Sequence, residues 1–290
     1  MVSIGGVTVD EIFATIETYF FFENKVDRQF VLTHMPRSKA FLKRAGMKSN
    51  FAVIKIRDDY SSWEVEVDWL SERELMHRPS HIFLYEKMDG IMYIDIRQMV
   101  IEQPEFDNLL WAIRDEIRGG TRYFIVDLRY NGGGNSLVNQ RIFGAMGITE
   151  PTKGLYFRIS PLSVEQAFIN VRSFSENLQA MPTTETAENR NNVTIAVLTN
   201  AQTYSSARLF AQSVQDGGFG VVVGEASRNA PSAFGNMLQF TLPQTQINLN
   251  VSSSRLLRPD INANQLMIAP DIKASSDNAL EAALNYFNGR

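Results

Sequence analysis

Two short stretches of the sequence combine residue types that can stabilise a negatively charged oxygen. The first is "TNAQTYSSARLFAQSVQDGG", residues 199–218, in which an apolar strand ends, a polar turn follows and a helix begins near Ser205. A hydroxyl at a helix N-terminus lies among unpaired backbone N–H groups and at the positive end of the helix dipole. Ser205 is therefore a candidate nucleophile, although this segment alone is more simply explained by Ser205 or Ser206 capping the helix.

The second stretch is "YFIVDLRYNGGGNS", residues 123–136, in which an apolar strand runs into three consecutive glycines. Glycine loses more backbone entropy on folding than any other residue, so three in a row indicate a backbone that another group must approach closely. A reacting carbonyl is one such group, because backbone N–H groups can stabilise the charge that develops on its oxygen. The two stretches together suggest a site for acyl transfer.

The elements that must position these stretches alternate between strands and helices. Asp89-Gly90 lies between two short apolar strands, which is typical of a β-hairpin. Further strands are predicted near residues 123–130, 191–200 and 219–225, with helices near 103–120, 135–147, 205–218 and 275–289 and an antiparallel pair near 237–257. This alternation favours an α/β layered fold of short strands. Residues 83–290 are predicted to form the core domain, and residues 1–82 a smaller helical attachment.

Composition limits the possible function classes. The chain has 290 residues, of which 44% are hydrophobic and 21% charged, as is ordinary for a soluble globular protein. A net charge of -4 and the lack of a long basic cluster argue against nucleic-acid binding. No apolar run reaches the roughly 20 residues that span a bilayer, and the opening residues do not have the pattern expected of a signal peptide. The absence of cysteine excludes disulfides, thiolate metal sites and a cysteine nucleophile.

Four stretches in a fixed order resemble a known family. They are "DLRYNGGG" (127–134), "NAQTYSSARLFAQSVQD" (200–216), "VVVGEAS" (221–227) and "PDI" (270–272). In order and spacing they resemble the C-terminal-processing, or tail-specific, serine peptidases, with their tricorn-core and retinoid-binding relatives. The resemblance covers roughly residues 83–273, and the opening "VSIGGVTVDEIF" is similar to the stretch that precedes the core domain in bacterial members.

The resemblance implies a crotonase/ClpP-like core, a polypeptide substrate, no cofactor, and an extracytoplasmic or secreted bacterial protein. Ser205 falls on the family's nucleophile, in the pattern T-x-S-[SA]-A-E. The N–H groups of Ser206 and of the glycine loop, Gly133 with Gly132 as its neighbour, would form the oxyanion hole. The residues expected to support the site rather than react are Asp127, Arg129, Asn131 and Glu225.

The general base of the family is missing from its expected positions. The processing peptidases use a lysine 25 residues after the serine, where this chain has Ala230, and no lysine lies between Lys153 and Lys273. The tricorn-like branch uses a histidine N-terminal to the core domain, and we expect that histidine to lie upstream of Met1. A weakened site is also possible, because Arg208 stands where the motif has an acid, and Asn264 or Gln265 stands where an acid or glutamine is expected near "PDI".

The chain's own histidines provide weaker candidates. His77 and His81 precede the first core strand and could reach the site, but structural roles are expected for both. Their His-x-x-x-His spacing does not predict a metal site, because Pro79 interrupts the helix that would align them.

Three functions remain open at this stage. The first is a serine peptidase with Ser205 as its nucleophile and a histidine from outside the chain as its base. The second is a catalytically inactive relative that binds a peptide or an apolar ligand in the same cleft. The third is an unrelated crotonase-like acyl-transfer enzyme, which the ordered motifs disfavour.

Overall fold

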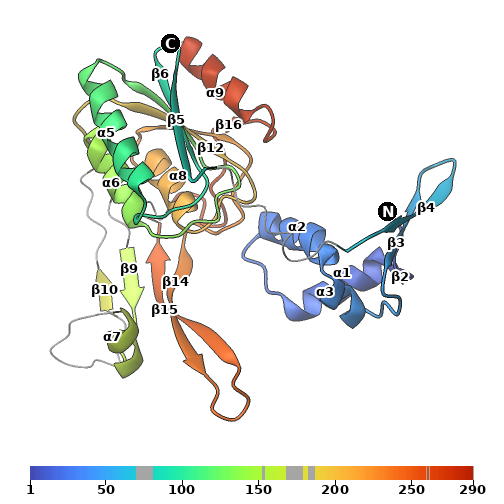
Figure 1. Ribbon diagram of the computed structural model, residues 1–290. Coiled ribbons are helices and arrows are strands. Elements are labelled where there is room, and N and C mark those ends of the chain that lie inside the picture. The colour runs from blue at the N-terminus through green and yellow to red at the C-terminus, as the bar shows by residue number, and fades with distance from the viewer. Residues whose placement is uncertain are drawn as a thin grey trace. The chain divides into compact units, whose positions relative to one another are not determined.

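The computed structural model describes residues 1–69, 81–151, 154–167, 179–181, 187–258, 260 and 262–289, and the side chains of 167 and 179–181 are left out of the account below. The chain forms two compact units, Met1–Ser80 and His81–Arg290 (Figure 1). Within the described residues, no helix is long and apolar enough to span a membrane. The same residues contain no group of three or more potential metal ligands.

The first unit combines helices with an antiparallel sheet. Its elements are β1 (Ser3–Ile4), β2 (Val7–Thr8), α1 (Val9–Tyr19), α2 (Lys25–His34), the 3₁₀ helix η1 (Met35–Arg37), α3 (Lys39–Arg44), β3 (Ala52–Arg57) and β4 (Ser62–Val67). Helix α1 begins with a capping box between Thr8 and Glu11, and it buries Ile12 and Ile16, which are one turn apart. The strands are ordered β2-β1-β3-β4. The prediction of a helical attachment is therefore incomplete, because the unit also contains a four-stranded sheet.

A six-stranded sheet forms the centre of the second unit. Its strands are β5 (Phe83–Met88), β6 (Ile91–Ile96), β7 (Tyr123–Asp127), β12 (Thr194–Thr199), β13 (Gly220–Gly224) and β16 (Ile272–Lys273), in the order β16-β13-β12-β7-β6-β5. All neighbours are parallel except β5 and β6. These two form the predicted hairpin, in which Asp89 and Gly90 both have positive φ. The mixed sheet with its helices confirms the predicted α/β fold class.

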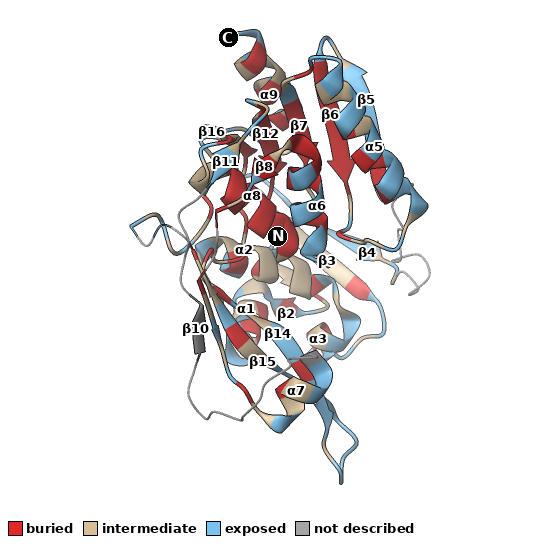
Figure 2. Ribbon diagram, turned by 90° about the vertical axis from the view of Figure 1, so that its left-hand side faces the viewer, coloured by how far each residue is buried: buried red, intermediate tan, exposed pale blue. Residues whose placement is uncertain are grey.

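Helices cover both faces of this sheet. The elements on one face are α5 (Pro104–Arg118), α6 (Leu137–Met146) and α8 (Ser206–Asp216), and α9 (Ala279–Asn288) covers the other. Alternate residues of each strand point to opposite faces: Phe124 and Val126 pack with the first group, whereas Ile125 packs with α9. Strands β6, β7 and β12 are consequently buried over most of their length (Figure 2).

The remaining strands form two smaller sheets. Strands β9 (Gly154–Phe157), β10 (Gln179–Met181), β14 (Ala233–Thr241) and β15 (Asn248–Leu257) are ordered β10-β9-β15-β14, and helix α7 (Pro161–Ala167) follows β9. The pair β14–β15 is the predicted antiparallel pair. Strands β8 (Ile148–Thr149) and β11 (Glu188–Asn189) form a short ribbon.

Candidate active site

The two stretches that could carry out chemistry, residues 123–136 and 199–218, lie at one edge of the central sheet. The glycine loop follows β7, and Ser205 follows the neighbouring parallel strand β12 after a turn of five residues, 200–204. In an open parallel sheet, ligands bind outside the carboxyl ends of the strands, where such loops converge. Side chains hold the turn to the β7 side: the Thr203 hydroxyl donates to the Leu128 carbonyl at 2.8 Å, and the Tyr130 N–H donates to Asn200 Oδ1 at 3.1 Å.

Ser205 has an unusual backbone conformation. It occupies the N-cap position of α8 with φ 52° and ψ -121°, a region that non-glycine residues rarely adopt. Its side chain makes no capping hydrogen bond to the helix. The hypothesis that Ser205 serves only as a cap therefore has no geometric support, and the strain is the kind that persists at functional positions.

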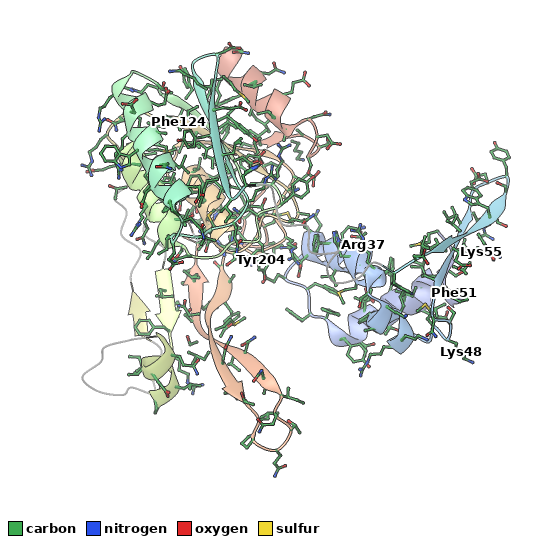
Figure 3. All side chains as sticks on the ribbon, viewed as in Figure 1. Arg37, Lys48, Phe51, Lys55, Phe124 and Tyr204 are labelled. Carbon is green, nitrogen blue, oxygen red and sulfur yellow. The ribbon has the colours of Figure 1, made fainter. Side chains whose placement is uncertain are left out.

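The glycine loop is pressed directly against Ser205. A Cβ atom at Gly133 would lie 2.6 Å from Ser205 Cβ and 2.9 Å from the Ser206 nitrogen, and Gly133 also has φ +96°. Gly134, with φ +138°, would clash with the Met99 carbonyl at 2.3 Å. Glycine is thus required here for both space and conformation. Tyr204, the residue before Ser205 (labelled in Figure 3), joins the two segments by donating its N–H to the Asn131 carbonyl at 2.9 Å.

The backbone N–H groups of this loop are not equivalent. Gly133 donates its N–H to Asn131 Oδ1 at 2.8 Å, and Asn131 Nδ2 donates in turn to the Ile96 carbonyl at 2.8 Å. The Gly133 N–H, predicted to face a substrate, donates to Asn131 in this structure. Gly132 is exposed, and neither its N–H nor that of Ser206 donates to any residue that the structure describes. The geometry thus favours Gly132 and Ser206 as the oxyanion donors.

Ser206 joins the loop and the helix. Its hydroxyl donates to the Gly134 carbonyl at 2.7 Å, and its own carbonyl accepts from Asn139 Nδ2 at 2.8 Å. A cavity of about 270 Å³ lies beside this contact, lined by Ser136, Asn139, Gln140, Glu150, Pro151, Leu209 and Leu256. Of the residues in this contact, Asn139 is the one that lines the cavity.

The predicted supporting residues form a network behind the loop. The Asp127 carboxylate is fully buried and accepts from the Arg129 guanidinium and from the Tyr93 hydroxyl. Burial raises the pKa of Tyr93 above its usual value, as do the Asp127 and Asp95 carboxylates. The hydrogen bond to Asp127 likewise raises the pKa of Arg129. Both groups stay protonated at neutral pH, so they serve as fixed donors rather than proton carriers.

Glu225 and Arg129 also fix the segment before α9. Glu225 Oε1 accepts from the Ser276 N–H at 2.9 Å and from the Ser276 hydroxyl at 3.0 Å, and Arg129 Nη1 donates to the Ser276 carbonyl. These contacts place Asp127, Arg129 and Glu225 in the scaffold of the sheet edge.

Neither His34 nor His81, the two histidines that the structure describes, contacts Ser205. His81 Nε2 lies 3.0 Å from Asp95 Oδ2, and the Arg97 guanidinium donates to the same oxygen at 2.5 Å. His77 lies outside the described residues. Among the residues that the structure covers, no side chain forms a hydrogen bond with the Ser205 hydroxyl.

Asn229 is a site residue that the sequence patterns do not reveal. Its Oδ1 accepts the Ser205 N–H at 3.0 Å and lies 3.3 Å from Arg208 Nε. Nothing in "EASRNAPS" marks Asn229 except that it precedes Ala230, the position of the family's lysine. Arg208, where the motif has an acid, is a buried side chain that also donates to Gln212 Oε1 at 2.7 Å and to the Pro231 carbonyl at 2.9 Å.

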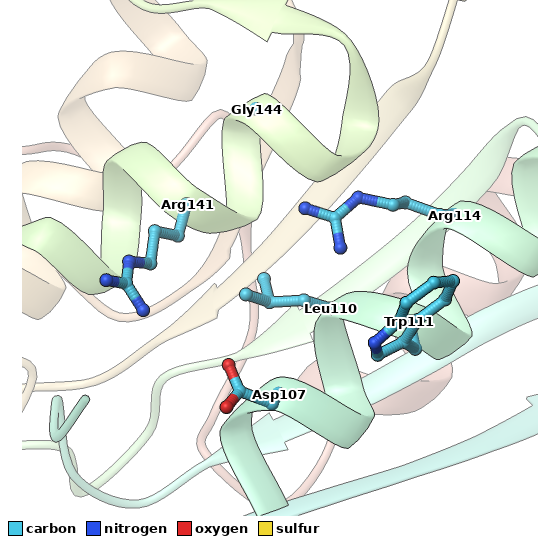
Figure 4. A pocket seen from close by; sticks show the side chains of 6 residues that line it. All are labelled: Asp107, Leu110, Trp111, Arg114, Arg141 and Gly144. Atoms are coloured by element: carbon cyan, nitrogen blue, oxygen red, sulfur yellow. The ribbon is translucent and has the colours of Figure 1, made fainter. Parts of the chain in front are cut away.

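A second cavity, of about 460 Å³, lies away from these residues. It is lined by Asp107, Leu110, Trp111, Arg114, Arg141 and Gly144, on helices α5 and α6 (Figure 4). Neither Ser205 nor the glycine loop contributes to its lining. The larger cavity is therefore not the candidate active site.

Comparison with known proteins identifies a family for the second unit. The model of the family described as "Peptidase family S41" matches residues 90–274, more than half of the chain. No curated protein matches the sequence significantly.

Solved structures share the fold. Mature CPAF is 14% identical with a TM-score of 0.58, over 99% of this chain and 74% of that chain. Mature CPAF complexed with lactacystin is also 14% identical, with a TM-score of 0.59 over 99% of this chain and 76% of that chain. A putative peptidase from Parabacteroides merdae is 15% identical with a TM-score of 0.50, over 96% and 94% of the two chains. At such identities the likeness shows the fold alone.

Proposed function

The chain belongs to peptidase family S41, the C-terminal-processing serine peptidases, and on this premise we propose that Ser205 is the nucleophile of a peptide-bond hydrolase. The substrate of such an enzyme is a polypeptide. The observation that carries the proposal is the strained, uncapped Ser205 at the start of α8, with the glycine loop against it. A strained turn from strand to helix is the geometry that exposes a nucleophilic hydroxyl above a sheet.

The proposed mechanism assigns one task to each part of the sheet edge. The Ser205 hydroxyl attacks the scissile carbonyl, and the Gly132 and Ser206 N–H groups stabilise the resulting oxyanion. The N-terminus of α8 adds the positive end of its dipole at the same point. Because Gly133 and Gly134 have no side chains, the scissile carbonyl can approach the backbone of the loop. A histidine from a segment upstream of residue 1 would take the Ser205 proton.

Chemical labelling tests the nucleophile. We expect a fluorophosphonate probe to modify Ser205 in a chain extended by its natural upstream residues, and Ser205→Ala to abolish the labelling. The extended chain should also cleave a disordered polypeptide such as casein, whereas residues 1–290 alone should cleave it at least about 10³-fold more slowly, because removing the base leaves only the oxyanion and binding contributions. Ser232→Ala, which alters another partly buried serine, is the control. Labelling that persists in Ser205→Ala would refute the assignment.

A binding protein without catalytic activity is the second candidate, and one observation favours it. Ala230 stands where the processing peptidases have their lysine and Arg208 where the motif has an acid, so the chain lacks both of these groups. In that case the extended chain would bind a disordered peptide but neither cleave it nor react with the probe. Peptide binding measured by fluorescence anisotropy, alongside the cleavage assay, distinguishes the two functions.

We also propose an extracytoplasmic or secreted bacterial location, which rests only on the family. Fractionation of the producing cells, with the chain detected by antibody, tests it. Recovery in the cytoplasm would contradict this location without affecting the assignment of Ser205.

A further inference from the structure

The N–H group of Ser205 needs a hydrogen-bond acceptor from outside its own helix. At φ 52° the residue turns away from the preceding chain, and the first N–H groups of a helix have no partner within it. An N–H group buried without a partner destabilises a fold, so the strained conformation persists only if another segment supplies an oxygen.

Asn229 supplies that oxygen from the connection between β13 and β14. Its side chain is 4% exposed, and its Oδ1 accepts the Ser205 N–H at 3.0 Å. The distance along the chain is 24 residues, so this contact ties two separate loops of the sheet edge together.

Arg208 orients the Asn229 side chain. The guanidinium is 2% exposed and donates from Nε to Asn229 Oδ1 at 3.3 Å. Its Nη1 donates to Gln212 Oε1, one turn further along α8, and to the Pro231 carbonyl. The fork of an arginine side chain holds such contacts in a fixed plane. Asn229 is therefore held with its oxygen, rather than its NH₂ group, toward Ser205.

We propose that Asn229 is a positioning residue for the nucleophile, and that Arg208 fixes it. The inference rests on the proposed role of Ser205, because positioning matters only if this hydroxyl reacts. By holding the Ser205 N–H, Asn229 sets the turn that presents the hydroxyl and leaves the Ser206 N–H directed to the substrate. A small misplacement of reacting groups slows a reaction strongly. The residue that replaces the acid of the family's motif thus has a structural task in this site.

The experiment replaces the acceptor and measures the Ser205 amide itself. In Asn229→Ala and Asn229→Leu, hydrogen exchange of the Ser205 amide should accelerate by about tenfold or more, because its acceptor is lost. Exchange of Leu198 in β12 should stay unchanged. Asn229→Asp keeps an oxygen at the same point and should restore slow exchange. Asn250→Leu, on the exposed part of β15, is the matched control.

Labelling by a fluorophosphonate provides the second measurement, in the chain extended upstream. Asn229→Ala should lower the labelling rate of Ser205 about tenfold or more with the amount of bound peptide unchanged, and Asn229→Asp should restore it.

The outcomes separate this inference from the proposed function. If Ser205 in the unsubstituted chain never reacts with the probe, the proposed function fails while the exchange data still decide the Asn229 contact. If the Ser205 amide exchanges equally slowly in the Ala and Leu variants, Asn229 is not its acceptor and the inference is wrong. If every variant, Asn229→Asp included, loses protection at Leu198, Asn229 is needed for folding and the positioning role is overturned.

Discussion

At the scale of single residues, Ser205 is partly buried and has a strained backbone. Its φ of 52° and ψ of -121° are unfavourable for a residue with a Cβ atom, and its hydroxyl does not stabilise α8 by a capping hydrogen bond. A serine kept in this state is better explained by reactivity than by stability.

Replacing Ser205 by glycine should stabilise the protein. Glycine adopts positive φ without steric penalty, so Ser205→Gly should remove about 1–3 kcal/mol of strain, reduced by about 0.5–1 kcal/mol of extra backbone entropy. A rise in melting temperature of about 2–4 °C is expected for a unit of this size. Thermal unfolding followed by circular dichroism measures it. Ser205→Ala loses the same hydroxyl but keeps the strain, so an equal rise in both variants would show that the hydroxyl, not the backbone, causes the instability.

The glycine loop leads to a second prediction for single residues. Gly133→Ala places a Cβ atom 2.6 Å from Ser205 Cβ and 2.8 Å from the Tyr204 carbonyl, at a φ of +96°. We expect a loss of at least about 2 kcal/mol in the free energy of unfolding, from overpacking and backbone strain together. Urea unfolding measures it.

Gly132→Ala is the matched control, because a Cβ atom there meets nothing within 4 Å. Its effect on unfolding should stay within about 0.5 kcal/mol, as for other surface substitutions. Equal losses in the two variants would contradict the requirement for glycine at position 133.

At the scale of elements, an ion pair links helix α5 to the edge strand β5. Glu116 accepts from Lys87 at 2.7 Å and from the Thr121 hydroxyl at 2.6 Å. The hydrogen bond from Lys87, followed by that from Thr121, lowers the pKa of Glu116 below its ordinary value of 4.5. A carboxyl group with a lowered pKa in the folded state stabilises the fold above its unfolded pKa, and that stability is lost as the pH falls through the folded pKa.

Glu116→Gln should therefore destabilise the protein at pH 7 and matter less in acid. The side chain is 26% exposed, so we expect a loss below about 1 kcal/mol at pH 7, which narrows as the pH falls below about 4.5. Urea unfolding at pH 7 and pH 4 measures both values. Glu86→Gln, an exposed residue of β5, should show neither effect. A loss of unfolding free energy in Glu116→Gln that is larger at pH 4 than at pH 7 would contradict this prediction.

At the scale of the whole molecule, each unit has a hydrophobic core of its own. The core of the first unit is centred on residues such as Ile12, Ile16 and Leu42, whereas the central sheet of the second packs Phe106, Phe124 and Phe210 on one face. Every buried residue of each cluster belongs to a single unit. Units with separate cores can in principle fold independently.

A fragment of residues 81–290 should therefore fold without residues 1–80. We expect cooperative thermal unfolding and slow hydrogen exchange in β7 and β12, as in the intact chain, because the sheet and both helical layers lie within the fragment. Circular dichroism and exchange of the Val126 and Val197 amides are the measurements. A fragment that exchanges these buried amides rapidly would show that the first unit is needed for the fold of the second.

The sequence by itself determined the features that depend on neighbouring residues. Apolar runs and helical spacing predicted the α/β class, Asp89-Gly90 predicted the hairpin, and the polar turn before an amphipathic segment predicted a helix starting at Ser205. These features are local, because the period of side chains along a strand or helix follows from backbone geometry. The ordered motifs also predicted the family that the comparison with Peptidase family S41 confirmed.

Only the tertiary structure decided how the site's polar groups pair. Asn229 accepts the Ser205 N–H across 24 residues, Arg208 donates to Asn229, and the Tyr204 N–H donates to the Asn131 carbonyl. Each of these pairings depends on which loops meet at the carboxyl edge of β7, β12 and β13. Strand order sets that edge, and no periodicity along the chain encodes which side chain an amide will meet there. The physical reason is that a hydrogen bond is decided by tenths of an ångström in space, whereas a sequence pattern records only which face of an element a residue occupies.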